Sequence, residues 1–558
     1  MVDPEADAAA RRRKRRRKKT QARCAPKRKR RTPAKRRRAS GAVVESPYPE
    51  RRTRAGSAGG RATDSAKRKK KAHKRVCKPK KKKKRPKRKP VLQPPPPPPA
   101  PPAAPIRLTS PLPIYSGPFG AAQAERLLWR AGFGPSPGHA QFLSMAGLHA
   151  SVAALTRPSG APIMTGAAPK GDDGNALEPA DAYGHDHLWW LDRMVRTSQP
   201  LVERMTLVWH DWFSTSNDGV GQQSLMLQQN ELFRRSAFGS FDRLAHDVTM
   251  DPAMIVWLNL DQNTRWSPNE NYARELMELF TLGADRGAYT EQDVRQLARA
   301  LTGFDFDWSD ELGMHNFRYV ASRHDTGSKT IFGQSGAFTW EQGVGMCVRH
   351  PLHPSFFVEK LWSYFIPTPP STAERQALER LYTGSGYQVR PVLEAILLHP
   401  TFYTGPRMVK PPVVFLAGLL RRLQMPIDAE YWVWYSQNAG QRLFYPPDVS
   451  GWDDSRWLDT ATVRGRFELV SRALNDHGVL TGAAVDDYDE TETPEAAVAA
   501  ARAWAGNPSL TSEGVAILTA FAASALSGAA GWQLSTYRGL RQNALRHLIL
   551  ASPDFQTS

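Results

Sequence analysis

Apolar residues recur at the spacing of an α-helix along most of the chain beyond residue 120. The clearest stripe follows Ser198-Gln199-Pro200, a typical helix start with proline in the first turn. Its members are spaced 4, 3, 1 and 3 residues apart: Leu201, Met205, Val208, Trp209 and Trp212. Further helices are predicted over 121–130, 253–260, 356–365, 373–382, 389–398 and 413–423, with two or three more after residue 493. Alternating extended segments are too few for a sheet-based fold, so the pattern predicts an all-α protein with one large multi-helix domain.

Two of the predicted helices carry explicit start and stop signals. Ser267-Pro268-Asn269-Glu270 predicts a capping box, with Ser267 as N-cap and proline at the first helical position. The helix it opens is expected to reach Leu282 and to end at Gly283. Thr290-Glu291-Gln292-Asp293 opens the next helix, which Gly303 closes. The core stripe of that helix is Val294, Leu297, Ala298 and Leu301.

Residues 304–340 interrupt the helical pattern with closely spaced aromatic, polar and glycine residues. We expect a long structured loop there, with a short hairpin, and loops of this length inside compact domains are usually functional. Residues 158–180, rich in glycine, proline and alanine, are predicted to form a surface loop. The predicted organisation is a tail over 1–90, a proline-rich linker over 91–113 and a helical domain over 114–558, which the acidic linker 485–493 could subdivide.

Charge separates the tail from the rest of the chain. Residues 1–90 hold 40 Lys and Arg against 6 Asp and Glu, a formal charge of +34. Residues 91–558 hold 37 of the chain's 77 basic and 47 of its 53 acidic residues, a formal charge of −10. A segment like the tail cannot bury enough apolar surface to fold, and its charges repel each other, so we predict that it is disordered. The six prolines of 94–99 favour polyproline II and a semi-rigid spacer.

The tail is expected to bind a polyanion by counterion release. Nucleic acid, an anionic lipid surface and an acidic wall polymer all remain open as partners. Tyr48 is the tail's only aromatic residue, which disfavours sequence-specific recognition of single strands by stacking. Residues 1–120 lack the apolar stretch that a signal peptide needs, which favours the cytoplasm. The uncharged stretch 514–532 is rich in Ala, Gly, Ser and Thr, so we expect a buried helix and no transmembrane segment.

Several kinds of site are excluded by the sequence. The three cysteines, Cys24, Cys77 and Cys347, are too few and too scattered for a disulfide framework in the body. There is no CxxC, HExxH, GxSxG, Walker glycine loop or dinucleotide fingerprint. The pattern therefore indicates no particular metal or cofactor.

The first candidate for chemistry is the helix predicted after Pro268. Glu270, Arg274 and Glu278 are spaced four apart and share one face, and Glu275 lies 100° beyond Arg274. The neighbouring residues are apolar on nearly all sides, so these charges are expected to be partly buried and paired. A structural ladder of Glu270, Arg274 and Glu278 is one interpretation. In the other, Glu275 and Glu278 are catalytic carboxylates and Arg274 binds an anion.

Two histidines are the other candidates. His210 points away from the apolar stripe of its helix, and is either a satisfied core histidine or a ligand or base. His324, Asp325 and Lys329 place a base or metal ligand, a carboxylate and a cation within one short segment. The alternative there is a polar turn, since Asp-Thr-Gly is common turn chemistry.

Ten stretches of the body together resemble the bacterial family catalogued as domain of unknown function 1800. They cover about 121–558: AERLLWRAGFGPSP (124–137), VWHDWFSTS (208–216), DPAMIVWLN (251–259), PNENYARELMELFTLG (268–283), YTEQDVRQLARALTGF (289–304), HDTGSKTIFG (324–333), SGYQVRPVLEAILLHPTFY (385–403), VKPPVVF (409–415), LFYPPDVSGW (443–452) and LASPDFQ (550–556).

The resemblance implies a helical fold but no settled activity. Members often carry export signals and are commonly encoded beside another exported family of unknown function, which implies an exported location and differs from the expectation above. The family often has WHNHF where this chain has WHDWF, so Asp211 and Trp212 stand where Asn and His would. A metal site built on that second histidine would be missing here.

Two functional hypotheses follow. The favoured one is a binding or structural module that its basic tail tethers to a polyanion, with aromatic residues of 304–340 contacting a partner. The alternative is a hydrolase-like enzyme, with or without a metal, at a pocket between helices. Its base or ligand would be His210 or His324 and its carboxylates Glu275, Glu278 and Asp325, while Arg274 and Lys329 would hold an anionic group.

Overall fold

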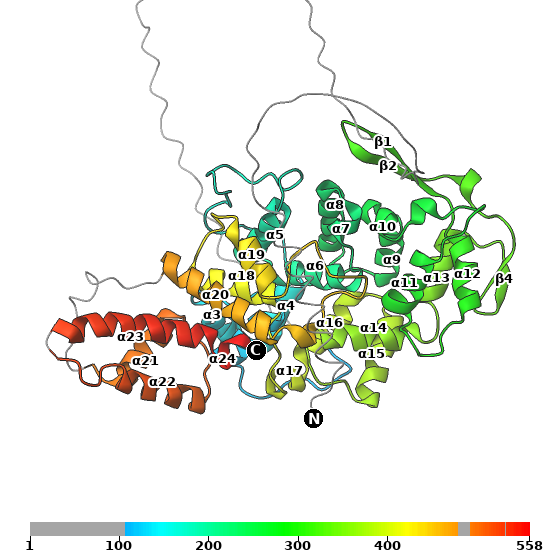
Figure 1. The fold of residues 1–558 in the computed structure, drawn as a ribbon. Helices are drawn as coiled ribbons and strands as arrows, with labels where there is room; N and C mark the ends of the chain where they lie inside the picture. Colours follow the sequence, from blue (N-terminus) through cyan, green and yellow to red (C-terminus); the bar gives the residue numbers. More distant parts are fainter. Residues whose placement is uncertain (1–106, 478–491, 531) are drawn as a thin grey trace, which may run out of the picture. The chain divides into compact units, whose positions relative to one another are not determined.

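The computed structural model describes residues 107–477, 492–530 and 532–558. The tail predicted over 1–90, most of the linker 91–113 and most of the acidic linker 485–493 lie outside the described residues. Within those residues the chain is helical, with two small two-stranded sheets (Figure 1). This confirms the predicted all-α class.

The helices before the aromatic segment include those predicted after Ser198, over 253–260 and after Thr290. They are α2 (Ala121–Arg130), α3 (His139–Ala146), α4 (Leu148–Thr156), α5 (His185–Arg196), α6 (Pro200–Trp212), α7 (Asn217–Val220), α8 (Gln223–Arg235), α9 (Phe241–Thr249), α10 (Pro252–Trp257), the 3-10 turn η2 (Leu260–Gln262), α11 (Asn271–Glu275), the π-helical turn η3 (Leu276–Thr281) and α12 (Glu291–Ala300).

The helices after the aromatic segment are α13 (Trp340–Val348), α14 (His353–Ser363), α15 (Thr372–Gly384), α16 (Val389–Leu398), α17 (Pro400–Thr404), α18 (Pro412–Leu423), α19 (Tyr431–Asn438), the 3-10 turn η5 (Asp454–Arg456), α20 (Thr460–His477), α21 (Pro494–Trp504), α22 (Ser512–Ser524), α23 (Trp532–Ala551) and α24 (Pro553–Gln556). Four of them, α14, α15, α16 and α18, follow the predicted ranges within a few residues, whereas α13, α17, α19 and α20 had no predicted range.

The aromatic segment folds as two antiparallel hairpins joined by a 3-10 turn. Strands β1 (Phe304–Ser309) and β2 (Gly313–Tyr319) lie side by side in Figure 1, and their register runs from Phe304 opposite Tyr319 to Ser309 opposite Gly313. After η4 (Ala321–Arg323), β3 (Lys329–Ile331) pairs with β4 (Gln334–Gly336). The aromatic rings are not uniformly exposed: Phe304 is fully buried, whereas Trp308 is 67% exposed.

The predicted capping box at Ser267 is wrong, whereas the one at Thr290 is confirmed. Helix α11 begins only at Asn271, because side-chain amides hold the preceding backbone: Asn263 Oδ1 accepts from Asn269 N at 2.9 Å, and Asn269 Oδ1 accepts from Asn271 N at 2.9 Å. At Thr290, Oγ1 accepts from Asp293 N and the Asp293 carboxylate accepts from Thr290 N, which is the reciprocal pattern of a capping box.

The helix expected to run to Leu282 widens into a π-helical turn. Leu282 N donates to the carbonyl of Met277, five residues back, at 2.8 Å. A widened turn frees carbonyls that need other donors. The carbonyls of 279, 280 and 281 accept from side chains of α14 and α6, namely Lys360, Trp212 and His353. The helix then ends at Gly283, with φ of +86°, as predicted.

Helix α6 lies at the centre of the described fold, where two hydrophobic clusters meet. Eleven of its thirteen residues are buried. Leu201, Met205 and Trp209 belong to the cluster with α9 to α16, and Leu207 belongs to the cluster with α5 and α18 to α23. A helix buried on nearly all sides must satisfy its polar residues inside the protein.

The expected burial of the alanine-rich stretch after residue 513 is wrong. On α22, only Leu518 and Ala522 are buried, and Ile517 is 63% exposed. The many small side chains of this helix bury little apolar area, so little free energy favours its burial. None of the described helices is both long enough and apolar enough to cross a membrane.

Candidate functional site

His210 occupies a closed aromatic environment on α6. It is 1% exposed, and its ring lies 5.3 Å from that of Trp190 and 5.5 Å from that of Trp452. Its Nε2 is 3.2 Å from Phe444 N and accepts that backbone hydrogen bond. Burial lowers the pKa of His210 to about 3, so the ring is neutral near pH 7 and can act as the acceptor.

A second histidine holds the adjacent backbone in the same way. His187 of α5 is fully buried, and its Nδ1 accepts from Leu443 N at 3.0 Å. Its pKa is lowered to about 3, mainly by burial and also by the charge of Arg442. Phe444 has a φ of +67°, a conformation that a non-glycine residue adopts only when its surroundings hold it. His187 and His210 thus fix the turn that begins the segment LFYPPDVSGW.

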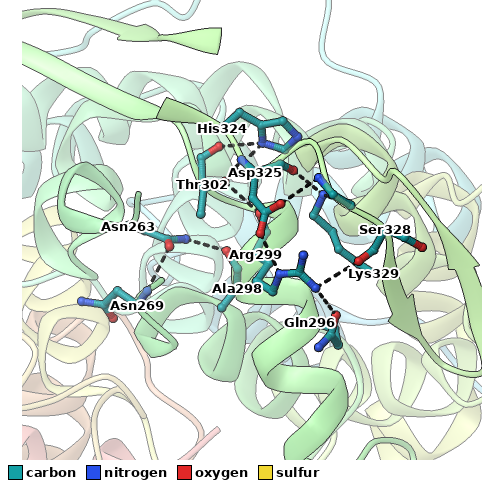
Figure 2. A network of polar contacts seen from close by, with 11 residues as sticks. Asn263, Asn269, Gln296, Ala298, Arg299, Thr302, His324, Asp325, Ser328 and Lys329 are labelled. Atoms are coloured by element: carbon teal, nitrogen blue, oxygen red, sulfur yellow. Dashed lines mark hydrogen bonds and ion pairs between the residues drawn. The ribbon is translucent and has the colours of Figure 1, made fainter. Parts of the chain in front are cut away.

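The segment after η4 forms a polar network with the C-terminal end of α12 (Figure 2). Asp325 accepts from Arg299 Nε at 2.7 Å and from Gly327 N at 2.8 Å. Lys329 Nζ donates to the carbonyls of Asp325 and Gly327, the latter at 3.0 Å. His324 Nδ1 lies 3.0 Å from the carbonyl of Thr302, which can only accept, so this ring nitrogen carries the proton.

The network satisfies carbonyls that the end of α12 leaves without helical partners. Asn263 Nδ2 donates to Ala298 O at 2.8 Å, Thr302 Oγ1 donates to Arg299 O at 2.8 Å, and His324 caps Thr302 O. Burial alone would raise the pKa of Asp325, but the hydrogen bonds from Arg299 and Gly327 outweigh it and lower the pKa. His324, Asp325 and Lys329 therefore do lie together, and they latch the β3 segment onto α12.

The acidic residues of α11 and η3 are only partly arranged as predicted. Arg274 pairs with Glu270 at 3.1 Å and with Glu291 of α12 at 2.7 Å. Glu291 replaces Glu278 in the expected ladder, because α12 packs beside α11. Glu278 instead accepts from Tyr289 OH at 3.5 Å. Burial, and then the charge of Glu278, raise the pKa of Glu275.

The predicted site residues fall into three separate environments. His210 contacts α5, α8 and the 444–452 segment. His324 contacts Thr302, just after α12, and Asp325 contacts Arg299 of α12. Glu275 and Glu278 lie on α11 and η3. Among the described residues, no hydrogen bond, ion pair or ring contact joins His210 to His324 or to Glu275. Arg274 and Lys329, proposed to hold an anion, are both engaged by protein oxygens. A catalytic role for any of them stays a prediction.

A cavity that the sequence interpretation missed lies against another face of α6. It has a volume of about 240 Å³. Arg204, Leu207, Val208 and Asp211, at i, i+3, i+4 and i+7 of α6, line one side. Lys360, Ser363 and Tyr364, at i, i+3 and i+4 at the end of α14, line another. The remaining lining residues come from 408–457: Met408, Pro411, Gln441, Ser450, Trp452, Asp454 and Trp457.

Asp211 is held at one end of this cavity. Its Oδ2 accepts from Tyr364 OH at 2.6 Å, and its Oδ1 accepts from Trp452 N at 3.1 Å. The pKa of Asp211 is raised by burial, which outweighs those two hydrogen bonds and the nearby positive charges. Gly451 makes the approach feasible: its φ is +95°, and a Cβ there would lie 2.5 Å from Asp211 Oδ1.

Two cations complete the lining. Lys360 Nζ donates to Leu279 O at 3.0 Å and lies 4.5 Å from the centre of the Trp212 ring. Burial lowers the pKa of Lys360 to about 8, against the opposing effect of Asp211. Burial also lowers the pKa of Arg204 to about 10. The cavity therefore combines a carboxyl, a phenol, an amine and a guanidinium in a partly desolvated setting.

Spacing in the sequence marks the two helix faces that line this cavity, each taken separately. Arg204 and Asp211 are two turns apart on α6, off its apolar stripe, and Lys360 and Tyr364 are one turn apart at the C-terminal end of α14. What the sequence does not show is that these two faces meet, because 149 residues separate Asp211 from Lys360.

The family model described as Protein of unknown function (DUF1800) matches residues 126–557. The chain belongs to this family. No curated protein and no solved structure matches it.

The DUF1800 match contains the whole cavity, both structural histidines and the α12 network. Residues 1–125, which include the basic tail, precede the matched DUF1800 range. In the part of the chain that the structure describes, no group of three or more His, Cys, Asp or Glu residues is placed to hold a metal ion.

Proposed function

We propose that this protein is a tethered binding protein, in which residues 1–90 attach a helical DUF1800 body to a polyanion. The observation that carries the proposal is the charge division, +34 over residues 1–90 against −10 over the remainder. Each phosphate that a cationic residue neutralises releases counterions, so a segment of this charge binds a polyanion without a folded surface. The body, with its net negative charge, is repelled overall by the same partner.

The hydrolase-like alternative has less support. Its proposed residues, His210, Glu275 and His324, share no contact among the described residues, and His210 and His324 each serve a backbone group. General acid–base catalysis needs its groups within hydrogen-bond reach of one reacting molecule.

Salt dependence of polyanion binding tests the proposal. The full chain is titrated with a DNA duplex, with anionic vesicles and with a polyphosphate over a range of KCl concentrations. In the test variant, the nine cations of Arg11–Lys19 are replaced by glutamine. In the control variant, nine exposed cations of the body are replaced: Arg107, Lys170, Arg235, Arg243, Arg265, Arg295, Arg380, Arg390 and Arg464.

For DNA, the slope of log affinity against log salt should fall by up to about 8 in the test variant, since each phosphate contact contributes about 0.9. The control variant should keep the slope of the unmodified chain. Equal slopes in the test variant and the unmodified chain, with a lower slope in the control, would contradict the proposal. The three polyanions distinguish the possible partners.

A further inference from the structure

Arg204 is a buried cation without a direct ion pair among the described residues, although the nearby Asp211 carboxyl raises its pKa against the effect of burial. It is 4% exposed, and its Nε donates to Arg130 O at 3.3 Å. Within 107–477, 492–530 and 532–558, its two terminal nitrogens have no hydrogen-bond acceptor and no ion-pair partner. The two terminal nitrogens are not fully enclosed by protein atoms. They are therefore accessible from the cavity that Arg204 lines.

We infer that this cavity binds a small molecule carrying a carboxylate or phosphate group, which the terminal nitrogens of Arg204 hold. A guanidinium presents its donors as a rigid fork that matches the oxygens of either group. A buried guanidinium whose terminal nitrogens lack hydrogen-bond acceptors is unfavourable, and a bound oxyanion reduces the part of that penalty that Asp211 does not offset. Lys360 supplies a second positive charge to the same cavity.

The rest of the lining limits the ligand further. A volume of about 240 Å³ corresponds to about eight water molecules, below the range of drug-sized pockets, so the ligand is small. The Cα atoms of Arg204 and Asp211 are about 10 Å apart along the axis of α6, and their side-chain charges are close enough to shift each other's pKa. An oxyanion at Arg204 thus leaves the other end of the ligand near Asp211 and Tyr364, which can bond a hydroxyl or amine.

The cavity has an entrance for such a ligand. Ser363, Ser450 and Asp454 line it and are all exposed, so one side opens to solvent. Trp452 and Trp457 provide flat apolar walls beside the polar groups. This site is independent of the basic tail. Its ligand is a small molecule, whereas the proposed partner of the tail is a polymer.

Thermal unfolding of the full chain tests the inference with three probes: inorganic phosphate, acetate and acetamide, the uncharged counterpart of acetate. The variants are Arg204→Gln and, as a charge-matched control, Arg243→Gln, whose side chain is 79% exposed. The tail is identical in all of them, so any binding of anions by the tail cancels in the comparison.

Phosphate or acetate should raise the unfolding midpoint of the unmodified chain and of the control, with at least a tenfold weaker apparent affinity in Arg204→Gln. Acetamide should have no such effect. A response to phosphate alone identifies a phosphate ligand, and a response to acetate alone a carboxylate. Equal affinity in Arg204→Gln and the control, or no response to either anion, would overturn the inference.

Chemical modification avoids the need for a folded variant. The unmodified chain is treated with 2,3-butanedione, and the rates at Arg204 and Arg243 are measured by mass spectrometry in the same sample. The effective anion should slow modification of Arg204 at least fivefold and leave Arg243 unchanged. Equal slowing at both, or no reaction at Arg204 without anion, would show that its nitrogens do not form the site.

Discussion

His210 shows how a partner far away in the sequence decides the role of a buried polar residue. Its acceptor role comes from Phe444, 234 residues further along. Sequence spacing places His210 off the apolar stripe but cannot show which group it meets. Arg204 and Asp211, on the same helix, are equally visible as polar residues, and only the packing of α14 and the 450–457 segment makes them part of a cavity.

Replacing His210 should change how stability depends on pH. The unfolded histidine takes up a proton near pH 6.5, whereas the folded one resists protonation down to about pH 3. Between those values the unfolded state binds more protons, so the free energy of unfolding falls as the pH is lowered. In His210→Gln, whose Oε1 can still accept from Phe444 N, this contribution is absent.

From pH 6.5 to 4.5, the unmodified chain should therefore lose about 2 kcal/mol more stability than His210→Gln. Urea unfolding of both proteins at several pH values measures the difference. Parallel curves over this range would show that His210 does not remain a neutral acceptor in the folded protein.

Among the elements, those fixed by short-range contacts are predictable from the sequence. The capping box at Thr290 involves four consecutive residues and forms as expected. The one at Ser267 fails because Asn263, outside the motif, binds Asn269 N instead. The π-helical turn could not be predicted, since the donors to its carbonyls, including Lys360 and Trp212, come from other helices.

The α12 network predicts a local loss of stability when Asp325 is replaced. Asp325→Asn removes the charge that pairs with Arg299, and hydrogen bonds to a charged group contribute about 1.5–3 kcal/mol when partly buried. Because the amide oxygen can still accept, we expect a loss of about 1 kcal/mol and faster amide exchange in residues 324–329.

Asp247→Asn is the matched control, since its partner Arg243 is 79% exposed and such pairs contribute at most about 0.5 kcal/mol. Urea unfolding and amide hydrogen exchange give the two readouts. If Asp325→Asn exchanged in 324–329 no faster than the control variant, the segment would be held by other contacts.

At the scale of the whole molecule, the chain combines a cationic segment with a helical DUF1800 body of opposite formal charge. Composition alone reveals this division, because net charge needs no knowledge of contacts. The family and the all-α class are likewise predictable from motifs and periodicity. The cavity, the structural histidines and the latch on α12 are not, because each joins segments distant in the sequence.

Lysine footprinting of the full chain bound to a DNA duplex tests the central claim most directly. Beyond residue 90 the chain has four lysines, of which Lys170 is exposed. Lys170 therefore reports DNA contact by the body, and the lysines of 67–89 report contact by the tail. We predict that DNA protects the lysines of 67–89 from acylation, that added KCl removes this protection, and that Lys170 reacts at the same rate throughout. Protection of Lys170, with no protection of residues 67–89, would contradict the account.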